Sequence, residues 1–133
     1  MRALWVTLAF ALAACATAGP APELTGTAWL RADDADAAPH LPTITFTERG
    51  ASGFAGCNQW FAAAERDGAS IRFGNIGLTR RACPGAPMAA EQRFVRALRS
   101  ARSFAVRDGE LVLRDGGGGA VARFTPSPAE TDD

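Results

Sequence analysis

The sequence predicts an α+β fold, in which a compact antiparallel β-sheet is covered by one amphipathic helix. Three observations lead to this prediction. Apolar and polar residues alternate in many short segments, as they do in half-buried strands. Two Asp-Gly dipeptides, at residues 67–68 and 108–109, separate pairs of such segments and are typical of hairpin turns. Only one segment, residues 87–101, carries apolar residues at helical spacing.

The predicted strands are short and closely spaced, which favours antiparallel pairing through hairpins. The clearest alternation is in Thr43-Ile44-Thr45-Phe46-Thr47, and Glu48-Arg49-Gly50 follows it as a turn. In chain order, the strands are expected at residues 25–31, 43–48, 51–55, 59–66, 69–73, 76–81, 104–107, 110–114 and 120–125.

The predicted helix runs from Pro87 to Ala101. Proline suits the first turn of a helix, where its missing amide hydrogen is not needed. The apolar face is made by Met88, Phe94, Val95, Leu98 and Ala101. We therefore expect this face to pack on the sheet.

The first residues have the pattern of a secretion signal. Arg2 precedes an apolar run from Ala3 to Ala14 that is too short to span a bilayer. Leu12-Ala13-Ala14-Cys15 resembles the lipobox of bacterial lipoproteins. The resemblance implies a signal peptide at residues 1–14, cleavage before Cys15 and acylation of the Cys15 thiol. Because Ala16 rather than aspartate follows, it also implies an anchor in the outer membrane, facing the periplasm.

Residues 15–23 would then be the lipidated cysteine and a flexible spacer, followed by one domain at residues 24–125 and a disordered tail at residues 126–133. The 119 residues left after cleavage are enough for a single domain. The chain has 14 basic residues, all arginine, and 14 acidic residues, so its formal net charge is zero. This balance gives no reason to expect a nucleic-acid partner, and we expect a monomer.

Three sequence pieces place the domain in a known family. They are Leu24-Thr25-Gly26-Thr27-Ala28-Trp29, Gly53-Phe54-Ala55-Gly56-Cys57-Asn58, and Thr79-Arg80-Arg81-Ala82-Cys83-Pro84 before Met88 and Glu91. Their order and spacing resemble the META-domain family, which includes small HslJ-like heat-shock lipoproteins.

The resemblance implies a compact domain of antiparallel strands with one helix, and a link to heat-shock or envelope stress without an established enzymatic activity. The family-motif residues with an implied structural role are Trp29, Gly53, Gly56, Asn58, Thr79 and Pro84. Gln59 stands where the family often has a basic residue.

Cys57 and Cys83 are the two thiols that remain once Cys15 is acylated. An even number of cysteines in an oxidising compartment favours a structural disulfide between them. A redox-active pair is the alternative, but there is no Cys-x-x-Cys motif. Two thiols and one distant histidine are too few ligands for a zinc site.

The remaining polar residues suggest no catalytic centre, cofactor or metal. Gly53 and Gly56 are expected to allow a bulge or a close backbone approach, and Asn58 to cap a turn or adopt a positive φ. His40 lies near Asp33, Asp34 and Asp36, which could form a metal or acid–base cluster, but a solvated loop is the simpler interpretation. No Gly-x-Ser-x-Gly motif marks a serine nucleophile.

The helix is rich in arginine, with Arg93, Arg96, Arg99 and Arg102 at three-residue spacing. A solvated face explains this pattern. The alternative is a basic contact patch for anionic lipid headgroups or a partner protein, made by Arg80, Arg81, Arg93 and Arg96.

Together these features predict a non-enzymatic envelope lipoprotein that supports stress tolerance by binding an envelope protein or a small ligand. The alternative is a periplasmic thiol-dependent oxidoreductase or weak hydrolase.

Overall fold

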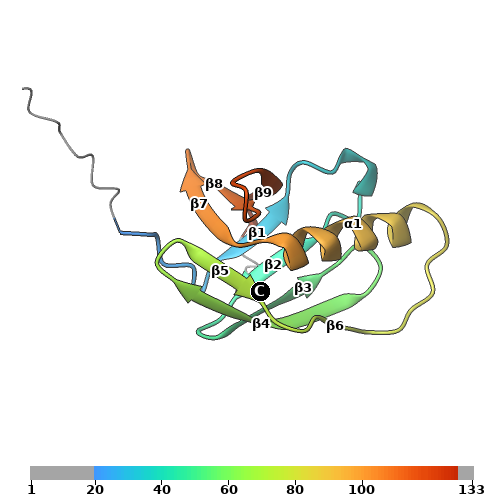
Figure 1. The fold of residues 1–133 in the computed structure, drawn as a ribbon. Helices are drawn as coiled ribbons and strands as arrows, with labels where there is room; N and C mark the ends of the chain where they lie inside the picture. Colours follow the sequence, from blue (N-terminus) through green and yellow to red (C-terminus); the bar gives the residue numbers. More distant parts are fainter. Residues whose placement is uncertain (1–19, 129–133) are drawn as a thin grey trace, which may run out of the picture.

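The computed structural model describes residues 20–128, and Figure 1 shows their fold. Residues 1–19, which include the predicted signal peptide and Cys15, and residues 129–133 lie outside the described residues. The elements are β1 (Ala28–Arg31), a short 3-10 helix η1 (Ala35–Ala37), β2 (Thr43–Phe46), β3 (Gly50–Phe54), β4 (Gln59–Asp67), β5 (Ser70–Phe73), β6 (Gly77–Leu78), α1 (Ala86–Ser100), β7 (Ser103–Arg107), β8 (Glu110–Arg114) and β9 (Ala120–Pro126). The α+β fold predicted from the sequence is confirmed.

The strands form one antiparallel sheet that closes on itself. Its order is β3-β2-β1-β9-β8-β7-β5-β4-β6, and a further pairing joins β3 to β4. The nine-residue strand β4 makes this closure because residues 59–63 pair with β3 while residues 64–67 pair with β5. The pairing between β5 and β7 is the shortest in the sheet, since only Ser70 and Ser103 are paired in register.

The core lies inside the closed sheet and under α1. Trp60, Ala62 and Ala64 of β4 point inward, whereas Gln59 and Phe61 point outward, as the period of a strand requires. A chain of aromatic rings crosses the core with neighbouring centroids 5.5–6.5 Å apart; it runs through Phe46, Phe73, Trp60, Phe94 and Phe124. Phe94 belongs to α1, so the helix is fixed to the sheet by aromatic packing.

The two Asp-Gly hairpins and the helix are found where the sequence predicts them. Asp108 and Gly109 have φ angles of 53° and 77°, the conformation that a two-residue hairpin turn with matching twist requires. Helix α1 begins after Gly85 and has Pro87 in its first turn.

The sequence prediction differs from the structure at several strand ends; β2, for example, ends at Phe46 and not at residue 48. Residues 25–27 form a turn, with the Thr27 amide donating to the Leu24 carbonyl oxygen at 3.0 Å, so β1 begins only at Ala28. Strand β6 is limited to two residues, although the Thr79 amide still donates to the Gln59 carbonyl oxygen of β4 at 3.0 Å. Strand β9 extends to Pro126, and the Ser127 amide donates to the Ala28 carbonyl oxygen at 2.9 Å. The start of the predicted tail therefore belongs to the sheet.

Candidate functional site

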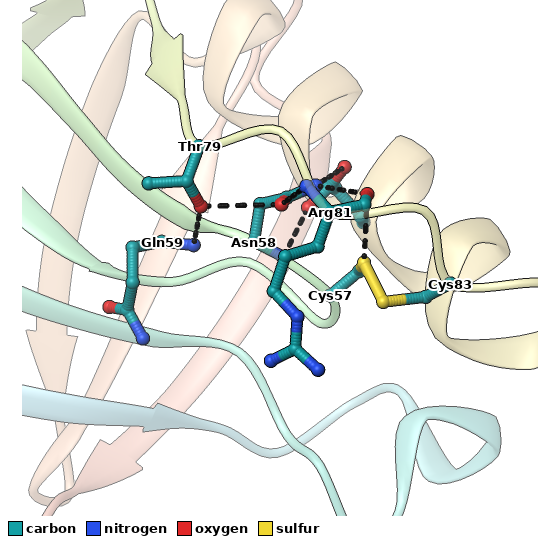
Figure 2. The surroundings of a disulfide bond; sticks show 7 residues. Cys57, Asn58, Gln59, Thr79, Arg81 and Cys83 are labelled. Atoms are coloured by element: carbon teal, nitrogen blue, oxygen red, sulfur yellow. Dashed lines mark hydrogen bonds between the residues drawn. A yellow bond between two sulfur atoms is a disulfide. The ribbon is translucent and has the colours of Figure 1, made fainter.

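Cys57 and Cys83 form a disulfide bond, as the sequence predicts, with their Cα atoms 5.9 Å apart (Figure 2). Cys57 lies in the loop between β3 and β4 and is 3% exposed. Cys83 lies in the segment that leads from β6 to α1. The bond therefore ties the sheet to the segment before the helix.

Asn58 fixes the same segment through its side chain (Figure 2). Its Oδ1 atom accepts hydrogen bonds from the Arg81 amide at 2.6 Å and from the Thr79 hydroxyl at 3.2 Å. Its Nδ2 atom donates to the Arg81 carbonyl oxygen at 3.3 Å. The structure thus shows Asn58 as a cross-link between segments. Of the two roles that the sequence suggested for Asn58, a positive φ is not found, because Asp108 is the one non-glycine residue with positive φ among residues 20–128.

Glu91 of α1 completes this polar cluster. It is 5% exposed, and its carboxylate accepts hydrogen bonds from the backbone amide of Asn58 at 2.7 Å and from Asn58 Nδ2 at 3.2 Å. Glu91 belongs to the third sequence piece but is not among the site residues predicted from the sequence. A signal for it exists, since Glu91 stands at helical spacing before Phe94, Val95 and Leu98 and so occupies the buried face.

Thr79 and Arg81 contribute differently to the cluster. The Thr79 hydroxyl accepts a hydrogen bond from the Gln59 amide at 3.0 Å while it donates to Asn58. Arg81 takes part through its backbone, and the residue as a whole is exposed. Cys57 Sγ lies 3.5 Å from the Arg81 carbonyl oxygen. Because a sulfur in a disulfide carries no hydrogen, this is a packing contact.

The two motif glycines allow the close backbone approach that the sequence predicts. A Cβ atom at Gly53 would overlap the carbonyl oxygen of Thr43, which also accepts a hydrogen bond from Trp60 Nε1 at 3.0 Å. Gly56 has a φ of 121°, and a Cβ atom there would lie 3.0 Å from the Glu91 amide nitrogen. Gly56 therefore lets the Cys57 loop lie directly against α1.

The other two motif residues have structural surroundings of their own. Trp29 is buried in β1, and its Nε1 donates to the Thr27 hydroxyl at 2.7 Å. Pro84 is exposed in the turn between Cys83 and α1.

The acidic loop before β2 is not wholly solvated. Asp34 is 7% exposed, and its two carboxylate oxygens accept hydrogen bonds from Nε and Nη2 of Arg93, both at 2.9 Å. This pair holds η1 against α1. The hydrogen bond from Arg93 lowers the pKa of Asp34 below its ordinary value. Nearby, Arg31 Nε donates to Asp33 at 3.0 Å. The prediction of a solvated loop is therefore wrong for Asp34, although His40 is exposed.

The Asp34–Arg93 ion pair removes one arginine from the basic contact patch that the sequence suggested. Arg93 is engaged with Asp34 and is not available as a simple surface charge. Arg80, Arg81 and Arg96 are exposed. Across residues 20–128, no group of three His, Cys, Asp or Glu side chains is arranged to hold a metal ion. In the same part of the chain, α1 falls short of the length and apolarity of a membrane-spanning helix.

Comparison with known proteins identifies the family. The family model of the META domain matches residues 22–128. The chain belongs to the META domain family. The match includes all three sequence pieces and the whole Asn58–Glu91 cluster with its disulfide. The resemblance inferred from the sequence is confirmed.

Two solved structures have a similar fold. A protein from Burkholderia xenovorans, solved by NMR, has a TM-score of 0.65 and 24% sequence identity over 79% of this chain and 84% of that chain. A second protein solved by NMR has a TM-score of 0.59 and 14% identity over 77% of this chain and 90% of that chain. These similarities concern the fold. No curated protein matches the chain.

Proposed function

We propose that this META domain is a non-catalytic module of the cell envelope, anchored through acylated Cys15 in the outer membrane and facing the periplasm. It supports heat-shock and envelope stress tolerance by binding an envelope protein or a small ligand. The observation that carries the proposal is the Cys57–Cys83 disulfide. Such bonds persist in exported proteins and are rare in the reducing cytosol.

The way in which the polar residues are used supports a structural role for the motif. The side chains of Asn58, Thr79 and Glu91 bond to one another or to backbone groups of neighbouring segments. Groups held in this way stiffen the fold where the sheet meets the helix. The family motif therefore builds a rigid support, and we expect ligand contacts on the surface around it.

The anchor and the compartment can be tested by cell fractionation and thiol labelling. The wild-type chain is expected in the membrane fraction, released by detergent and not by high salt, with no thiol that reacts with maleimide after unfolding without reductant. The Cys15→Ser variant is the matched control, since it keeps the apolar run and loses the acylated thiol. Wild-type protein in the cytosolic fraction with Cys57 and Cys83 both labelled would contradict the proposal.

The role in stress tolerance can be tested by complementation. In a strain that lacks the gene, the wild-type chain is expected to restore survival at high temperature, and Cys15→Ser at equal abundance is expected to restore less. Crosslinking in whole cells followed by purification of the wild-type chain would then identify the bound envelope component. Equal survival with and without the gene would count against the role.

The alternative of a thiol-dependent oxidoreductase predicts a different result. An exchanging disulfide would be reduced by glutathione at millimolar concentration in the folded protein. The 3% exposure of Cys57 leads us to expect reduction only after unfolding.

A further inference from the structure

A groove lined by arginine lies between the end of β5 and the C-terminal end of α1. Its charged lining is Arg72 of β5, Arg99 of α1 and Arg102 just after the helix, with Asn75 beside them and Phe73 and Ile76 as apolar surface. Its volume is about 380 Å³, which is in the range of small-ligand sites. Figure 1 shows the C-terminal end of α1 close to β5, two elements far apart in the sequence.

Among the described residues, the arginines of this groove form no ion pair with a carboxylate. No acidic residue lines the groove. The ion pairs among residues 20–128 involve Arg31, Arg93 and Arg123, and none of the groove arginines. Glu65 stands opposite Arg72 in the β4–β5 register, and it lines an adjoining pocket together with Asp67, Arg72 and Arg102. Neither carboxylate forms an ion pair with these arginines or lines the groove itself.

Structural roles account for part of this cluster only. Positive side chains near the end of a helix interact favourably with its dipole, which suits Arg99 and Arg102. Arg102 Nη1 also donates to the carbonyl oxygens of Arg99 at 3.0 Å and Ala101 at 2.7 Å, which fixes this side chain at the groove. Arg72 comes from a strand and is explained by neither role. Its presence makes three like charges converge on one concave site.

We propose that this groove binds a phosphate group. A phosphate carries up to two negative charges and several acceptor oxygens, which suits several guanidinium groups better than a single carboxylate does. Asn75, which also lines the groove, adds a neutral donor. Arg99 also lines the adjoining surface with Arg96, so a larger phosphorylated molecule would meet further positive charge beyond the groove.

The possible sources of the phosphate follow from the proposed function, which places the domain beside a membrane. The spacer between Cys15 and Leu24 spans at most about 30 Å when extended, so an anchored domain stays within reach of lipid headgroups. The phosphate could therefore belong to a phospholipid headgroup or to a small phosphorylated molecule of the periplasm. Both sources present the same chemistry to Arg72, Arg99 and Arg102.

The test measures binding by the full chain, as isolated from the expressing cell, in uncharged detergent. Glycerol 3-phosphate and inorganic phosphate are titrated by calorimetry, with acetate at equal ionic strength as the comparison anion. Saturable binding of phosphate compounds and none of acetate is expected. Arg72→Gln and Arg99→Gln should each raise the Kd at least tenfold. Arg107→Gln removes one charge from an exposed position in β7 that lines no described groove, and it should change the Kd less than twofold.

A second arm uses vesicles of phosphatidylcholine with and without phosphatidylglycerol. If soluble phosphates fail to bind but vesicles with phosphatidylglycerol bind the wild-type chain and not Arg99→Gln, the proposal holds with a lipid headgroup as the source. If neither ligand binds, or if Arg107→Gln weakens binding as much as Arg99→Gln, the groove is not a phosphate site. Fractionation decides the proposed function separately, so the two can fail independently.

Discussion

The disulfide bond gives the most quantitative prediction. Unfolding the protein in reductant and refolding it with the reductant present removes a cross-link between residues 26 positions apart, without substituting any residue. In the chain-entropy treatment, a closed loop of this length stabilises the native state by about 3.5 kcal/mol at 25 °C. For the roughly 109 described residues, the same loss lowers the melting temperature by about 15 °C. The reduced protein should nevertheless fold, because Asn58 and Glu91 still join the same segments.

Urea unfolding followed by tryptophan fluorescence measures this difference, since Trp29 and Trp60 are both buried. The oxidised protein, the reduced protein and the Cys57→Ala/Cys83→Ala variant should all show a single transition. The reductant should have no effect on the variant, which serves as the control. A difference below about 1 kcal/mol between oxidised and reduced protein would refute the loop-closure argument.

Three further predictions concern single contacts. The coupling between Asp34 and Arg93, measured in a double-mutant cycle with alanine, should be about 1–2 kcal/mol at pH 7. The folded-state pKa of Asp34 is lowered, so this stabilisation is fully present above the unfolded pKa of about 4. It should decline below that pH and be lost as the pH falls through the lower folded-state pKa, whereas a pH-independent coupling would contradict the ion pair. Asn58→Ala should lower the free energy of unfolding by about 3 kcal/mol, because the buried Glu91 carboxylate loses its hydrogen bond from Asn58 Nδ2. Urea unfolding measures this change, and a cost below about 1 kcal/mol would show that the cluster is unimportant. Gly53→Ala should lower the free energy of unfolding by about 3 kcal/mol, because its Cβ would overlap the Thr43 carbonyl oxygen. The control Gly74→Ala should cost little, because its Cβ would lie at an ordinary contact distance of 3.4 Å from the Ala63 Cβ. Equal melting temperatures of the two variants would refute the close approach.

Local patterns were sufficient to predict most elements of the fold. The Asp-Gly turns specify hairpins through backbone geometry, and the apolar spacing from Met88 to Leu98 specifies the helix. The closure of the sheet could not be predicted in this way. It depends on β3 and β5 pairing with different parts of β4, which is a property of tertiary packing. The short pairing between β5 and β7 could not be predicted from the sequence either.

The residues around the disulfide likewise separate into those that local sequence could predict and those that depend on tertiary contacts. The two motif cysteines could be assigned because an even number of thiols in an oxidising compartment favours a disulfide. The two motif glycines could be assigned because glycine in such a segment often marks a close approach of two backbones. The partners of Asn58 could not, since Arg81 and Glu91 reach it from other segments. The pairing of Asp34 with Arg93 joins residues 59 positions apart and turns one charge of a seemingly solvated helix face into a structural contact. Conversely, Arg72 gains significance only because the fold places it beside Arg99.

The central claim is that this chain is exported, anchored by lipid at Cys15 and oxidised at Cys57 and Cys83. Intact-mass measurement on protein isolated from its native membrane tests all three parts at once. The account predicts a chain that begins at Cys15, carries fatty acyl groups, and gains the mass of two hydrogens when it is reduced. A chain that still begins at Met1, without acyl groups and with no change on reduction, would contradict it.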